Sequence, residues 1–143
     1  MSFMKEIGET YRCYALFRAK YLEKEGIVGS QYLYIKTICR APGISQDELA
    51  SRLVFNKSSV ARQLATLEQN GFVERRRSEK DKRILLVYPT EKAKEVMPVI
   101  EGVVREFLTA LGRDLSPAER EDLDRIMLTV TKNARQKLKE EDL

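Results

Sequence analysis

The sequence predicts a mainly α-helical fold that contains one short β-hairpin. Apolar residues recur every three or four positions through most of the chain, which is the period of amphipathic helices. The stretch from Phe72 to Tyr88 differs, because two runs of β-branched and aromatic residues flank a polar tract. With 143 residues the chain has the length of one ordinary domain, so we expect a single domain over residues 1–143.

Two helices are predicted before residue 44. In the first, apolar and aromatic side chains between Ile7 and Leu22 share one face, and two glycines follow. Ser30 can cap the second helix, which ends at the breaker cluster of residues 41–43.

The next two helices carry the clearest end signals. Ser45 and Glu48 have the spacing of a capping box, in which each side chain satisfies a backbone amide of the other. Asn56 is a good cap for a second helix of about fourteen residues, which ends before Gly71. Within this helix Val60, Leu64 and Leu67 share one face, which turns a row of small and polar side chains the other way.

The hairpin and two further helices complete the expected elements. Short strands are predicted at residues 72–75 and 84–88, joined by a charged tip. A long helix follows, in which Pro98 should produce a kink. Ser116 and Glu119 form a second capping box, with proline at the first position of the last helix.

The positive charge of the chain is concentrated in its centre. The net charge is +4, and residues 43–89 hold nine Lys and Arg against six Asp and Glu, which leaves +3 there. Six of those nine bases lie between Arg75 and Arg83. Such a cluster favours a polyanionic partner, although a charged hairpin edge also discourages strand aggregation.

Composition disfavours metal sites, cofactors and enzymes. The chain has no histidine, and its two cysteines, Cys13 and Cys39, lie 26 residues apart, so the usual zinc patterns and His-based nucleophile pairs are missing. We expect no metal or cofactor, and both cysteines to be buried as small apolar residues. No secretory signal or long apolar run is visible, so we expect a cytoplasmic protein without a membrane partner.

A short capped helix, a turn, a second helix and a basic hairpin follow in the order of a winged helix-turn-helix, whose second helix enters the DNA major groove. In that helix Arg62 has the fork geometry for a guanine, and Gln63 could serve an adenine. From it we expect DNA contacts by Asn56, Lys57, Ser58, Ser59, Arg62, Gln63 and Thr66. From the preceding helix and the wing we expect contacts by Ser45, Gln46, Arg75, Arg77, Lys80, Lys82 and Arg83.

Residues 45–96 contain Gly-Phe-Val-Glu-Arg at 71–75, then Asp81-Lys82-Arg83 and an apolar strand that ends at Thr90. In these features the chain resembles the MarR family of regulators, which implies a DNA-binding transcriptional regulator, and we expect a repressor. The resemblance implies that Arg83 inserts into the minor groove while Asp81 holds its guanidinium, so Asp81 joins the predicted DNA-binding set. After the strand, residues 89–93 depart from the family pattern, which usually has Leu-Thr and then a glycine.

The resemblance also implies a homodimer in which the first and last helices of two subunits interlock. Independently, residues 1–28 and 112–143 carry more apolar side chains than one small lobe can cover, which favours an interface. We assign these two segments to dimerisation and residues 29–111 to a winged lobe with a long connecting helix. A twofold dimer implies a pseudo-palindromic DNA site.

Many members of the family bind small aromatic or phenolic effectors between the dimer helices and the winged lobe and then release DNA. Three tyrosines on the first two helices and one arginine, an anchor for a carboxylate, form a candidate effector pocket: Tyr11, Tyr14, Arg18 and Tyr32. Tyrosines at helical spacing are also typical of a core. A regulator without a ligand switch is therefore an alternative, as is a winged-helix module that binds proteins.

Overall fold

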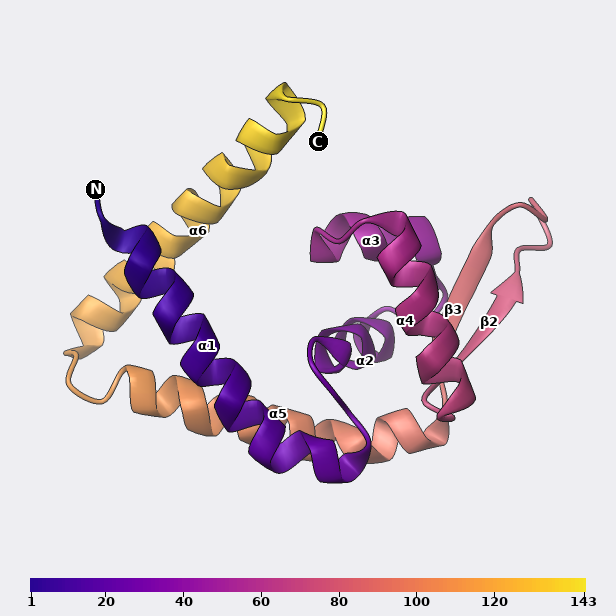
Figure 1. Ribbon diagram of the computed structural model, residues 1–143, viewed down its shortest axis with the longest axis horizontal. Helices are drawn as coiled ribbons and strands as arrows, with labels where there is room; N and C mark the ends of the chain where they lie inside the picture. Colours follow the sequence, from indigo (N-terminus) through magenta and orange to yellow (C-terminus); the bar gives the residue numbers. More distant parts are fainter. The chain divides into compact units, whose positions relative to one another are not determined.

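The computed structural model describes residues 1–143 and confirms a mainly helical winged fold (Figure 1). Its contacts divide the chain into two compact units, residues 1–105 and 106–143. The first unit contains, in order, α1 (Phe3–Leu22), a 3₁₀ turn (Glu23–Glu25), α2 (Gln31–Arg40), β1 (Ile44–Ser45), α3 (Gln46–Leu53), α4 (Lys57–Gln69), β2 (Val73–Arg77), β3 (Leu85–Pro89) and most of α5 (Glu91–Leu111). The second unit contains the end of α5 and α6 (Pro117–Glu140).

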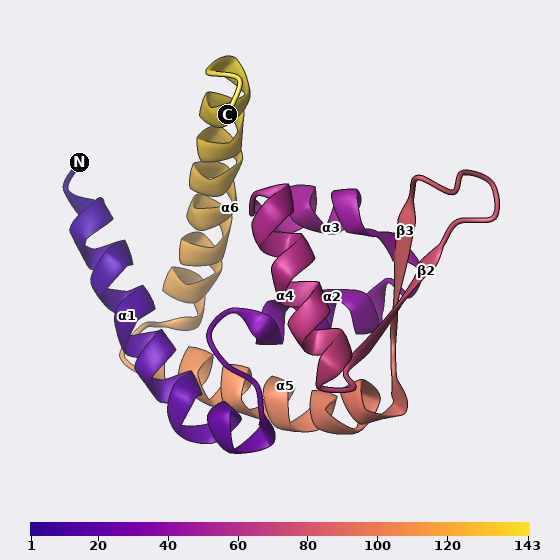
Figure 2. The same cartoon turned by 45° about the vertical axis from the view of Figure 1, so that its right-hand side comes forward.

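The core of the first unit joins α2, α3, α4 and α5 to the sheet. Ile35, Leu49, Leu64 and Ile100, one from each helix, are completely buried, and Val87 of β3 is buried with them. This agrees with the apolar period in the sequence, since each of these side chains lies on the predicted inner face of its helix or strand. Figure 2 shows α2, α3 and α4 grouped together, with the hairpin extending beyond them.

The sheet has three strands in the order β1-β3-β2, one more than the hairpin alone. The additional strand is the pair Ile44–Ser45, which runs antiparallel to β3 with Ile44 opposite Val87. Two residues show no alternation in sequence, so this strand could be found only from its non-local partner. The hairpin strands begin and end one or two residues later than predicted, at 73–77 and 85–89.

Two predicted end signals differ from the structure. Ser30 precedes α2, but its hydroxyl makes no capping hydrogen bond, because its backbone (φ −82°, ψ 2°) is not in the extended region that directs a cap toward the first turn. At α3 the Ser45 hydroxyl accepts the Glu48 N–H as expected. The Glu48 carboxylate binds Arg52 at 2.9 Å instead of returning to the Ser45 amide, so this capping box is only half formed.

The second unit buries little of its surface, and its main element is α6. Both halves of the capping box at Ser116 and Glu119 are present at the start of α6. No side chain of α6 is buried, and Leu123 and Ile126 are each about half exposed. None of the helices combines the length and the apolar character that a membrane span requires.

Only one of the two cysteines packs against the core as predicted. Cys39 is half-buried in α2, but Cys13 is exposed on α1. Cys13 lies nine residues before the buried Leu22, so at about 100° per residue the two lie on opposite faces of α1. The prediction for Cys13 is therefore wrong for the isolated chain. The carboxylates and cysteines form no cluster that could hold a metal ion.

Candidate nucleic-acid interface

The rotation of α4 about its axis is set by three completely buried side chains, Val60, Leu64 and Leu67. This face packs against the core, so the opposite face is turned to solvent. Exposed side chains there include Arg62 and Thr66, as the 3.6-residue period predicts. The interior of the lobe therefore determines which side chains α4 presents.

The first turn of α4 combines a side-chain cap with small polar residues. The Asn56 Oδ1 accepts the Ser59 N–H at 2.7 Å and the Ser58 hydroxyl at 2.9 Å. Across the turn, the Lys57 Nζ lies 3.5 Å from the Asp47 carboxylate. A helix cannot satisfy all of its first amides internally, and its N-terminus carries partial positive charge. This end of α4 therefore suits a phosphate group.

Farther along α4, the Arg62 guanidinium is exposed and held only loosely. Its Nη2 donates to the Ser59 hydroxyl at 3.3 Å, and the Thr66 hydroxyl donates to the Arg62 carbonyl at 3.2 Å. No carboxylate pairs with Arg62, and its remaining donors face solvent. The side chain can therefore form a two-point contact with an acceptor pair such as that of guanine.

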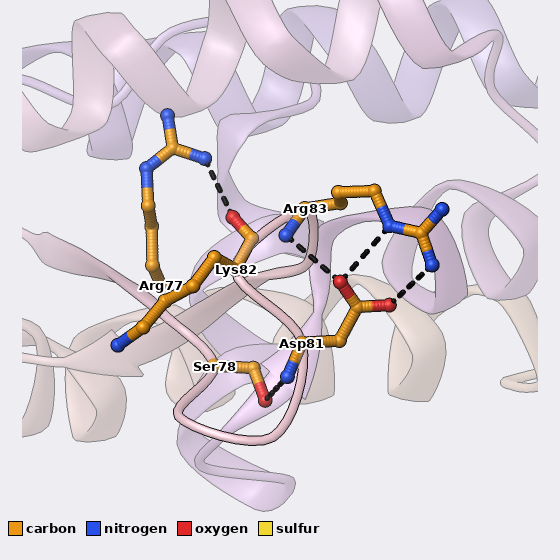
Figure 3. A network of polar contacts seen from close by, with 5 residues as sticks. All are labelled: Arg77, Ser78, Asp81, Lys82 and Arg83. Atoms are coloured by element: carbon orange, nitrogen blue, oxygen red, sulfur yellow. Dashed lines mark hydrogen bonds and ion pairs between the residues drawn. The ribbon is translucent and has the colours of Figure 1, made fainter.

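At the hairpin tip Asp81 holds Arg83 at three points (Figure 3). The Arg83 Nε and Nη2 donate to the two carboxylate oxygens at 3.0 and 2.9 Å, and the Arg83 backbone N–H donates to Oδ1 at 3.0 Å. These hydrogen bonds lower the pKa of the Asp81 carboxyl and raise that of the Arg83 guanidinium. The Arg83 side chain is nevertheless 90% exposed, so the clamp orients a cation that remains available to a partner.

Other hairpin bases have different surroundings. Arg77 donates to the Lys82 carbonyl at 2.9 Å, which closes the tip, and the Lys80 and Lys82 side chains are exposed. The Arg76 guanidinium lies over the Tyr88 ring, 4.4 Å from its centroid, and also pairs with Glu74. Arg77 is thus held by a neutral carbonyl and keeps its full charge, whereas Arg76 is paired with a carboxylate.

Arg75 joins three elements instead of projecting into solvent. Its guanidinium binds the Glu68 carboxylate of α4 at 3.3 Å and the Gln46 amide oxygen of α3 at 3.4 Å. Its backbone N–H also donates to Glu68 at 2.9 Å, and its side chain is only 20% exposed. The structure thus brings the predicted contacts Gln46 and Arg75 together, in an arrangement that holds the hairpin against the two helices.

The four residues of the candidate effector pocket also come together. The Arg18 guanidinium carbon lies 4.2, 4.5 and 5.7 Å from the ring centroids of Tyr32, Tyr14 and Tyr11. Arg18 is 4% exposed; its Nη1 donates to the Gly29 carbonyl, whereas its Nε is buried without a hydrogen-bond partner. Burial is the main cause that raises the pKa of the Tyr32 hydroxyl, and a hydrogen bond with Tyr14 adds to it. At neutral pH the tyrosine that faces Arg18 most closely is therefore uncharged.

Gln31 is a polar residue of this region that the sequence did not single out. It is 2% exposed on α2, and its amide links the Val28 backbone to Gln63 on α4. The sequence shows only that a glutamine begins a helix in which several of the following residues are buried. A single sequence does not show whether such a residue faces outward or inward.

Comparison with known proteins identifies the family. A family model described as the MarR family matches residues 27–85. The HTH-type transcriptional regulator BilQ of Clostridium symbiosum is 33% identical over 110 residues, which cover 77% of this chain and 76% of that protein. The chain belongs to the MarR family. Members such as BilQ are named as transcription regulators and not as enzymes.

Solved structures extend the likeness over the whole chain. The transcriptional regulator SlyA matches with a TM-score of 0.93 and 27% identity, over 97% of this chain and 98% of that one. A MarR-family regulator from Listeria monocytogenes, solved in complex with a 26mer DNA, matches with a TM-score of 0.91 at 22% identity, over 96% and 91% of the two chains. The MarR fold therefore includes α1 and α6 as well as the segment that the family model covers.

Proposed function

We propose that this MarR-family regulator binds double-stranded DNA sequence-specifically, with α4 in the major groove and the hairpin along the minor groove. The observation that carries the proposal is the pairing of a polar, exposed α4 face with an arginine that Asp81 orients at the wing tip. A structure of the same fold contains DNA. Because its proposed ligand is DNA, we infer that the protein acts in the cytoplasm. From its resemblance to MarR-family regulators we expect it to act as a repressor.

The test is selection of binding sites from random duplexes, followed by titration of the selected site at several salt concentrations. We expect a pseudo-palindromic site and an affinity that falls steeply with salt. Arg83→Ala should weaken binding to most duplexes and reduce the salt slope by about one. Arg40→Ala, which removes an exposed arginine of α2 outside α4, the hairpin and the proposed dimer segments, is the matched control. Failure to enrich any sequence would contradict the proposal.

The proposed DNA-bound form is a homodimer built from residues 1–28 and 112–143. On α6 the apolar residues Leu123, Ile126, Leu128 and Leu138 remain between 37% and 74% exposed, which is unfavourable for a helix with no partner. Sedimentation equilibrium should give twice the chain mass. Ile126→Glu should shift this toward the monomer and weaken binding to the full site, whereas a mass that does not change would exclude α6 from the interface.

A second candidate function, release of DNA by a small aromatic or phenolic effector with an acidic group, is favoured by the buried Arg18. A buried cation with no ion pair and an unpartnered Nε is costly unless an anion or polar oxygen completes its shell. Arg18 donates a hydrogen bond to the Gly29 carbonyl, and in the same loop the Val28 N–H donates to the Gln31 side chain. The Gln31 amide in turn donates to Gln63 of α4. Occupancy at Arg18 can thus be transmitted to the recognition helix.

Titration of the DNA complex with benzoate and phenol, followed by fluorescence anisotropy, tests the effector. We expect benzoate to release DNA from the unaltered protein and to have less effect on Arg18→Met, which keeps an unbranched side chain of similar length. Release that is equal in both proteins would place the effector elsewhere, and no release by either compound would favour a regulator without a ligand switch. The polar α4 face argues against the remaining alternative, a module that binds proteins.

A further inference from the structure

The oxygen and the nitrogen of the buried Gln31 side-chain amide both form hydrogen bonds. The Val28 backbone N–H donates to its Oε1 at 3.0 Å. Its Nε2 donates to the Oε1 of Gln63 at 3.2 Å. The side chain therefore connects the loop before α2 to the recognition helix.

The first of these hydrogen bonds fixes the direction of the second. A backbone N–H can only donate, so the oxygen of Gln31 must face Val28, and its NH₂ group must face α4. Gln63 must then accept with its own oxygen. Its Nε2 is left over, and it stays accessible to solvent, because the only buried side-chain donor without a partner in the chain is the Arg18 Nε.

Gln63 lies where such a donor can meet a base edge. It follows Arg62 directly and stands one helical turn after Ser59, so it flanks the exposed face of α4. The side chain is half-buried, as expected for a residue that contacts α2 with its oxygen and points its nitrogen outward.

We propose that Gln63 is a specificity-determining residue that reads guanine through its Nε2, and that Gln31 is the residue that positions it. This inference rests on the proposed DNA binding. Adenine is read by a glutamine that accepts from N6 and donates to N7 at once, with its oxygen and nitrogen both facing the base. The Gln63 oxygen has a second lone pair, but its contact with the buried Gln31 turns it toward α2 and leaves the nitrogen as the group that faces a base edge. Guanine presents two adjacent acceptors, N7 and O6, to the two hydrogens of one NH₂ group. The structure thus favours guanine, where the sequence suggested adenine.

Site selection with variants of the two glutamines tests the proposal. Gln63→Ala identifies the base position, since selection there should flatten while the rest of the site persists. At that position the unaltered protein should prefer guanine over adenine by about tenfold. Gln63→Glu presents only acceptors and should shift the preference to cytosine, whose major-groove edge carries a donor.

Gln31→Met separates positioning from reading. Without the fixed donor, the Gln63 amide can turn and use both groups, so the preference for guanine over adenine should fall to within about threefold. Thr37→Val is the matched control on α2, because it removes only a hydrogen bond to the Leu33 carbonyl and should keep the tenfold preference. Thermal unfolding followed by circular dichroism checks that both variants are folded; if Gln31→Met is not, Gln63→Glu decides the outcome alone.

A modified base gives an independent readout. Replacing the identified guanine by 7-deazaguanine should weaken binding of the unaltered protein by about tenfold and leave Gln63→Ala unaffected. Adenine at the identified position, or a Gln31→Met variant with an unchanged preference, overturns the proposal. If the unaltered protein enriches no site at all, the proposed DNA binding is wrong. If it enriches a site, and Gln63→Ala and Gln63→Glu show the same base preferences as the unaltered protein, only the proposed role of Gln63 is wrong.

Discussion

The recognition helix and the wing are ordered by different forces. The α4 helix is fixed by Val60, Leu64 and Leu67, which are completely buried in the core. Between residues 74 and 86 the hairpin has no buried side chain, and its tip is held by hydrogen bonds such as those from Arg83 to Asp81. Reading base edges requires side chains placed within fractions of an ångström, which a packed helix supplies. The proposed minor-groove contact of Arg83 requires mainly orientation, which the Asp81 carboxylate provides.

This difference predicts that changes to the two regions affect different quantities. Substitutions under α4 should lower the stability of the lobe, whereas substitutions at the wing tip should change DNA affinity and leave the folded state intact.

Removing a packed side chain beneath α4 should cost most. Leu64→Ala removes a completely buried side chain and leaves a cavity, so we expect the free energy of unfolding to fall by about 2–5 kcal/mol. Urea denaturation followed by circular dichroism measures it. Lys82→Ala, at an exposed tip position, should change the same quantity by less than about 0.5 kcal/mol. Equal losses in both would contradict the distinction between the regions.

On the exposed face of α4, substitution should change discrimination and not stability. Arg62→Ala removes the guanidinium that can bind two acceptors of one base, so we expect discrimination at one or two base positions to fall by about 1–3 kcal/mol. Binding of single-base variants of the selected site measures this. A loss of affinity that is the same for every sequence would assign Arg62 to the phosphate backbone instead.

Much of this architecture follows from local signals in the sequence. The caps at Asn56 and Ser116 fix where two helices begin, and the period of Val60, Leu64 and Leu67 fixes the face that α4 exposes. The contact between Asp81 and Arg83, two residues apart, was implied by the resemblance to the MarR family. In each case the decisive partners lie within about one turn of helix or one tight loop.

The features that the sequence did not reveal depend on distant partners. Strand β1 exists only because Ile44 meets Val87, and Gln31 is separated from Gln63 by 32 residues. Arg75 could be assigned to DNA from its charge, but its position between Glu68 and Gln46 emerges only when three elements pack together. Charge and spacing thus predict a DNA interface, and packing determines which contacts each of its side chains makes within the chain.

The turn before α4 offers a smaller test of how this helix is held. Val54 has a left-handed backbone (φ 58°), which is unfavourable for a β-branched residue, and its side chain is about half exposed. Val54→Asn should raise the free energy of unfolding by about 1 kcal/mol, because asparagine tolerates this conformation. If the core alone directs α4, base preferences in site selection should not change. A shift in preference would show that the strained turn also sets the direction of the helix.

The smallest expected effect is at the wing tip and depends on pH. The hydrogen bonds from Arg83 lower the pKa of Asp81, so the carboxylate stays charged to a lower pH in the folded hairpin than in the unfolded chain. The clamp therefore adds its full stabilisation above the usual pKa of aspartate and loses it as the pH falls through the lowered value. A ¹³C NMR titration of the Asp81 carboxyl should give a midpoint below that of a free aspartate, and Arg83→Ala should move it back up. An unchanged midpoint in Arg83→Ala would mean that Arg83 does not determine the charge of Asp81 in solution, and that the wing cation is not oriented before DNA arrives.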